Sequence, residues 1–100
     1  MKEDLLKIIN NYGVLSQLRP FNEESYELIE AIIKKEEDYQ FSETTVRIDK
    51  ENIRHIAEEM ADVMVMLKQF QYYYGIEDEQ IEEIMKYKIN RQLERLNKEK

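Results

Sequence analysis

The chain has 100 residues, which is enough for one domain with a single modest core. It contains no cysteine and only one histidine, so disulfides, thiolate zinc sites, a cysteine nucleophile and multi-histidine metal sites are excluded. The formal net charge of −7 argues against nucleic-acid binding through phosphate contacts. Two glycines and one proline, among many Glu, Lys, Ile and Leu residues, favour an all-α fold.

Residues 2–12 have apolar side chains at helical spacing and are followed by Gly13, which predicts a short amphipathic helix with a glycine C-cap. Residues 14–37 predict a second helical region that contains Pro20. This proline either kinks one long helix or lies near the start of a new helix that Asn22 caps. The sequence leaves both possibilities open.

Residues 38–48 are poor helix formers and predict a connecting loop with a short extended piece. Asp49 is then expected to cap a third helix over about residues 50–74, which Gly75 ends. The expected core stripe of this helix is Ile53, Ile56, Met60, Val63, Met64, Leu67 and Phe70.

Asp78 is expected to cap a fourth helix over about residues 79–97. The whole chain, residues 1–100, is therefore predicted to be one all-α domain, a bundle of about four helices. No run of about 18 apolar residues predicts a membrane span, and the N-terminal sequence lacks the basic-then-apolar layout of a secretory signal. We expect a cytoplasmic protein that binds neither membranes nor nucleic acid.

Two pairs of acidic residues have a spacing that suits a divalent metal. Residues three apart share a helix face, so Glu24 lies beside Glu27, and Glu59 lies beside Asp62. Two helices that present these pairs to each other would place four carboxylates around one cavity. Such carboxylates repel one another unless they share protons or a cation, and Mg²⁺ prefers oxygen ligands.

Asp62 interrupts the apolar run of residues 60–67, where an uncompensated charge is costly. A core stripe centred on Met60, Met64 and Leu67 would point Asp62 away from the core. That opposite side is also apolar, and a helix that is apolar all round is normally buried. We therefore expect the second face to pack against other helices or another subunit. The residues that make it apolar are Ala61, Val65 and Met66.

Simpler interpretations stay open for the same residues. Acidic side chains of Glu-rich helices commonly lie on solvated faces. Asp62 could instead be a structural acid paired with Lys68 or Arg54, and basic residues near the C-terminus could pair with acids of their own helix. Under these interpretations the chain is a non-enzymatic helical interaction protein. A third possibility is a helical metal buffer, in which the acids bind metal without hydrolysis.

Residues 23–27, EESYE, and residues 59–62, EMAD, resemble the EExxE and ExxD halves of one family pattern. The family is the MazG-like group of all-α nucleoside triphosphate pyrophosphohydrolases. The flanks ELIEAI (27–32) and AEEMADV (57–63) are also similar, and YKINR (87–91) looks like the closing basic segment of the family. The resemblance covers about residues 5–95.

The resemblance implies hydrolysis of the α–β phosphate linkage of a nucleoside triphosphate by an activated water, which yields the monophosphate and pyrophosphate. It implies Mg²⁺, with Mn²⁺ as a possible substitute, and association into homodimers or homotetramers. The implied metal ligands are Glu24, Glu27, Glu59 and Asp62. The implied catalytic residues are Glu23, which could orient the water, Glu24 and Glu27. The implied substrate-binding residues are Gln17, Lys88 and Arg91.

Overall fold

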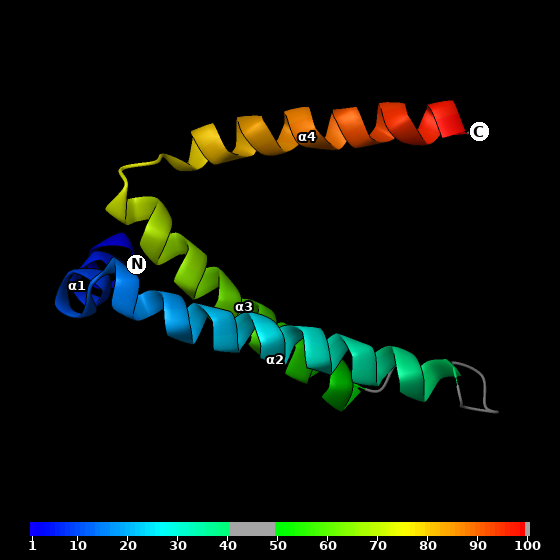
Figure 1. The fold of residues 1–100 in the computed structure, drawn as a ribbon, viewed down its shortest axis with the longest axis horizontal. Coiled ribbons are helices and arrows are strands. Elements are labelled where there is room, and N and C mark those ends of the chain that lie inside the picture. The colour runs from blue at the N-terminus through cyan, green and yellow to red at the C-terminus, as the bar shows by residue number, and fades with distance from the viewer. Residues whose placement is uncertain (41–49, 100) are drawn as a thin grey trace.

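A computed structural model describes residues 1–40 and 50–99 of the chain (Figure 1). These residues form four helices, α1 (Lys2–Tyr12), α2 (Val14–Gln40), α3 (Lys50–Tyr73) and α4 (Asp78–Glu99), and no strand. The predicted all-α class is confirmed. Residues 38–40 continue α2, so this part of the predicted loop is wrong, whereas residues 41–48 and the predicted cap Asp49 lie outside the described residues.

Three of the helices pack together. In Figure 1, α2 and α3 lie side by side and α1 lies against one end of this pair. The fourth helix, α4, packs against none of the other described helices and projects from the end of α3, so that α3 and α4 form a V. No helix in the described ranges is both long and apolar enough to cross a membrane. Among the residues whose burial the structure describes, the buried apolar side chains are those of Leu5, Ile9, Ala31 and Met66.

Two glycines end α1 and α3, as predicted. Gly13 has φ 87° and Gly75 has φ 70°, which is the left-handed region where a glycine avoids the steric cost of a Cβ atom. The Gly13 amide donates to the Ile9 carbonyl over 2.7 Å, and the Ile76 amide donates to the Gln71 carbonyl over 3.0 Å. These bonds satisfy carbonyls that the helix ends would otherwise leave free.

Pro20 lies inside one continuous helix, α2, and does not begin a new one. Asn22 is therefore an interior residue and does not cap a helix. A proline has no amide hydrogen, so the α-helical bond from residue 20 to the Ser16 carbonyl cannot form. The edge-to-face contact between Phe21 and Phe70, whose ring centroids lie 5.5 Å apart, holds this part of α2 against α3.

The face of α3 that packs on α1 and α2 differs from the predicted stripe. Ile56, Val63 and Phe70 are half-buried, as expected, but Met64 is 59% exposed, and Ile53, Met60 and Leu67 are exposed as well. The helix is apolar on both sides, so periodicity alone fits two faces and cannot choose between them. The packed face is formed by Ile56, Glu59, Val63, Met66 and Phe70.

The start of α4 is tied to the end of α3 by polar side chains. Asp78 is the first residue of α4 and accepts hydrogen bonds from Lys68 Nζ and Gln71 Nε2, each over 2.7 Å. The bond from Lys68 is the main reason that the pKa of Asp78 lies below its ordinary value, and the same bond raises the pKa of Lys68.

Candidate metal centre

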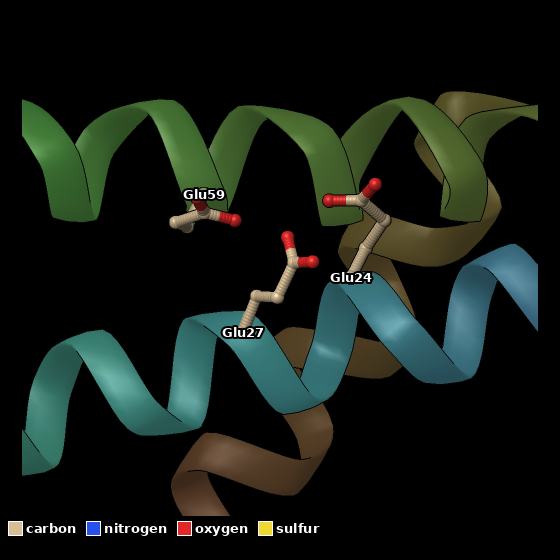
Figure 2. A group of neighbouring side chains, drawn as sticks. All are labelled: Glu24, Glu27 and Glu59. Atoms are coloured by element: carbon tan, nitrogen blue, oxygen red, sulfur yellow. The ribbon is translucent and has the colours of Figure 1, made fainter.

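Three carboxylates meet where α2 faces α3. Figure 2 shows Glu24 and Glu27 extending from α2 toward α3, and Glu59 lying between the two helices on the α3 side. Each residue offers one carboxylate oxygen, and these three oxygens lie within 4.8 Å of one another. The structure therefore brings together three of the four acids that the sequence predicts as metal ligands.

Helix periodicity explains why these residues meet. Glu24 and Glu27 are almost one turn apart, so both project from the same face of α2. Glu59 lies between Ile56 and Val63 on the packed face of α3, so its side chain is directed into the helix–helix contact. Glu59 thus occupies a position in the α2–α3 contact where an apolar residue would ordinarily pack.

Two oxygen atoms at this site are buried without a hydrogen-bond donor. Glu24 Oε2 and Glu59 Oε2 have no partner among the described residues. A buried acceptor without a donor loses its hydrogen bonds to water and forms none in the protein, which costs free energy of folding. Hard, oxygen-binding cations satisfy such atoms, so the all-oxygen donor set fits Mg²⁺ or Mn²⁺.

The same surroundings make protons bind more tightly. Burial raises the pKa of Glu24 above its ordinary value, and the charges of Asp62, Glu27 and Glu59 raise it further. Burial also raises the pKa of Glu59, with a further contribution from Glu27, while His55 opposes the shift. The site therefore favours whatever neutralises its charge, either protons or a cation.

Asp62 is the fourth predicted ligand and lies beside this triad. It is exposed and is not one of the three residues whose oxygens lie within 4.8 Å of one another, although its charge acts on Glu24. Its alternative structural partners are engaged elsewhere. Lys68 Nζ contacts Asp78 at 2.7 Å, and Arg54 Nε contacts Glu58 at 3.3 Å.

The remaining predicted site residues lie in other surroundings. Glu23 is exposed and its carboxylate lies 3.5 Å from Arg19 Nε. Gln17 is only 8% exposed and donates to Gln69 over 2.8 Å. Lys88 and Arg91 project from α4, which packs against neither α2 nor α3. The roles assigned to these four predicted residues stay predictions.

A pocket of about 330 Å³ adjoins the triad, and its lining includes Lys34 and His55, which the sequence analysis does not assign to the site. Lys34 lies two turns beyond Glu27 on α2, and His55 lies one turn before Glu59 on α3. His55 Nε2 is 3.9 Å from Glu59 Oε1. The sequence spacing could have indicated both residues, because Lys34 follows Glu27 by seven residues and His55 precedes Glu59 by four. The residues that line the pocket are Glu27, Glu30, Ala31, Lys34, Asn52, His55 and Glu59.

Comparison with protein-family models, with curated proteins and with solved structures finds no match to this chain.

Proposed function

We propose that this protein is a Mg²⁺-dependent nucleoside triphosphate pyrophosphohydrolase of the MazG-like kind, acting in the cytoplasm. It would cleave the α–β phosphate linkage of a triphosphate and release the nucleoside monophosphate and pyrophosphate. The observation that carries the proposal is the meeting of Glu24, Glu27 and Glu59, with ligand oxygens within 4.8 Å of one another and two buried oxygens that have no donor. The residue pattern at 23–27 and 59–62 supports it from the sequence.

The three carboxylates of the triad would hold the metal, and Asp62, whose charge already reaches Glu24, would complete the set. When bound, Mg²⁺ supplies Lewis-acid activation of a water and neutralises charge on the phosphate oxygens. The side chains of α2 and α3 hold these carboxylates in place before substrate arrives, because both helices are packed along the seam.

The pocket beside the triad offers a way for an acidic protein to bind a polyanion. Lys34 and His55 line it together with Glu27 and Glu59. Lys34 would donate to a phosphate oxygen of the substrate tail, and a protonated His55 would add a second positive charge. Asn52, in the same pocket, could donate an uncharged hydrogen bond from its side-chain amide.

The proposal includes association into homodimers or homotetramers. Exposed apolar side chains on α3, among them Met60, Met64 and Leu67, support it, because large exposed apolar faces of soluble proteins mark interaction surfaces.

Pyrophosphate release from a panel of ribo- and deoxyribonucleoside triphosphates with Mg²⁺ tests the proposed activity. We expect release from at least one of them, and its loss in Glu59→Gln. The matched control is Glu58→Gln, since Glu58 is an exposed neighbour that contacts Arg54. No release from any triphosphate, with Mg²⁺, Mn²⁺ or other divalent metals, would contradict the proposal.

The same exposed apolar face of α3 favours a second candidate function, that of a non-enzymatic interaction protein. Calorimetric titration of wild type and Asp62→Asn with Mg²⁺ and Mn²⁺ separates the two. If neither protein binds metal and the variant is more stable, the acids are not a metal site and the interaction protein is the better description.

A further inference from the structure

The helix α4 has an apolar stripe that nothing in the described chain covers. Its stripe residues recur mostly four apart, at Ile81, Met85, Ile89 and Leu93, and continue to Leu96. The last four of these are each about half exposed, and no residue of α4 is buried. Most of the stability of a helix in a protein comes from packing of such an apolar face, and α4 has no packing partner among the described helices.

The exposed surface area of the chain indicates how much surface a partner could cover. A compact monomer of 12.2 kDa exposes about 6,100 Å². This chain exposes 8759 Å². The excess of about 2,700 Å² exceeds the ~800 Å² that each partner buries in an interface of standard size.

The apolar stripe meets a pocket of about 500 Å³ in the angle between α3 and α4. Met64 and Leu67 of α3 and Ile81 and Met85 of α4 form its apolar lining. Its polar rim includes the acids Asp78 and Glu82. The only basic residue in the lining, Lys68, is paired with Asp78, so Glu82 leaves the lining with a net negative charge. The pocket therefore fits an apolar helix face that carries positive charge.

Residues 84–99 of α4 have this chemistry. The helix is divided by charge: residues 78–83 carry four acids and no base, and residues 84–99 carry five bases and two acids. Two copies of α4 that ran parallel would place acids against acids, whereas two antiparallel copies place the acidic start of each against the mainly basic remainder of the other. The acids of residues 78–83 are Asp78, Glu79, Glu82 and Glu83; residues 84–99 contain the bases Lys86, Lys88, Arg91, Arg95 and Lys98 and the acids Glu94 and Glu99.

We propose that α4 pairs antiparallel with α4 of a second copy of this chain, so that the mainly basic, apolar segment 84–99 of each helix lies against the α3–α4 pocket of the other copy. The occupant is a second copy because this chain carries both complementary surfaces. The pairing does not depend on the metal site or on the proposed activity.

Sedimentation velocity across a range of concentrations tests the association. We expect a mass of at least twice the 12.2 kDa of one chain, and a monomer for Leu93→Glu at concentrations where wild type associates. The matched control is Tyr87→Glu, on the side of α4 opposite the stripe, which should associate like wild type. Circular dichroism should show that each variant retains at least the helical content of α1, α2 and α3, because Leu93 lies outside these packed helices.

Cross-linking tests the antiparallel orientation of the two α4 helices. Because the chain contains no cysteine, each introduced thiol is the only one that can react. Glu79→Cys and Asn97→Cys place a thiol near opposite ends of α4, which is about 33 Å long, and both positions lie on the same flank of the apolar stripe. With a short bifunctional maleimide we expect the mixed sample to form a covalent dimer, and each single variant to form little. A monomer at every concentration, an unchanged mass for Leu93→Glu, or efficient cross-linking of each single variant would overturn the proposal.

Discussion

Glu24 on α2 and Glu59 on α3 each bury a carboxylate oxygen that has no hydrogen-bond donor among residues 1–40 and 50–99, on the two sides of one helix–helix contact. Their pKa values are both raised, with burial as the largest cause. Placing two such groups together destabilises the metal-free fold. With a bound cation, the same two carboxylates would stabilise the fold. This change in their contribution to the free energy of unfolding is measurable.

Mg²⁺ or Mn²⁺ should raise the melting temperature of the wild-type protein, because a ligand that binds only the folded state stabilises it by mass action. At a hundred times its Kd, the metal should add about 2.7 kcal/mol to the free energy of unfolding. Glu59→Gln should abolish this increase, while Glu58→Gln should keep it. Thermal scans with and without metal measure the effect, and an equal increase in Glu59→Gln would place the binding elsewhere.

The metal-free protein should lose stability as the pH rises above the ordinary carboxyl range. The folded state raises the pKa of Glu24 above 4.5, so it binds a proton more tightly than the unfolded state does. The stability contributed by that proton is present below pH 4.5 and is lost as the pH rises through the raised value. Glu24→Gln should therefore be more stable than wild type at pH 7, with a difference that shrinks toward pH 4.

Urea unfolding of both proteins across this range, with a chelator present, measures the difference. Glu23→Gln is the control, since Glu23 is exposed and lies outside the triad. In the same range the affinity for Mn²⁺ should fall on acidification, because protons compete for the raised carboxylates. A stability difference between Glu24→Gln and wild type that does not change with pH would show that Glu24 does not titrate as described.

If the protein hydrolyses triphosphates, Lys34→Gln should raise KM by about tenfold or more, because a hydrogen bond from a charged donor contributes about 1.5–3 kcal/mol. Lys35→Gln is the matched control, as the neighbouring lysine does not line the pocket. Steady-state kinetics with the best substrate measure both variants. Equal KM values for the two would remove Lys34 from the substrate site.

The buried amide pair of Gln17 and Gln69 should show a strong coupling. Gln69 is 2% exposed, and its Oε1 accepts from Gln17 Nε2 over 2.8 Å. Gln69→Leu leaves the Gln17 amide without its acceptor and should cost about 1–3 kcal/mol. The double variant Gln17→Leu/Gln69→Leu removes both partners and should recover most of that loss. Urea unfolding of the single and double variants measures the coupling, and strictly additive losses would contradict it.

Helix ends were predictable because their signals are local. Gly13 and Gly75 adopt positive φ, a conformation that other residues avoid, and each ends a helix where the sequence indicates. Pro20 shows the limit of such signals. Its local preference disfavours a helix interior, yet packing of α2 on α3, including the contact of Phe21 with Phe70, retains one continuous helix.

The candidate site was predictable as a set of residues but not as a geometry. The i, i+3 spacing placed Glu24 beside Glu27, and only the packing of α2 on α3 decides which side of α3 they face. The expected stripe through Met60 and Met64 would have directed Glu59 away from the centre of the contact. The actual packed face puts Glu59 in it, and also brings His55 and Lys34 to the same pocket.

The small buried core has a consequence for how the chain folds. Fully buried apolar side chains contribute about 1.5–3 kcal/mol each, and few are buried in the described residues. Such a core leaves little margin against the conformational entropy of this many ordered residues. If the second copy supplies the missing burial of α4, the ordering of α4 and the assembly of two chains are one bimolecular reaction, and dilution unfolds α4 before the packed helices α1, α2 and α3. The ordered fraction of α4 then depends on how much of the chain the cell makes.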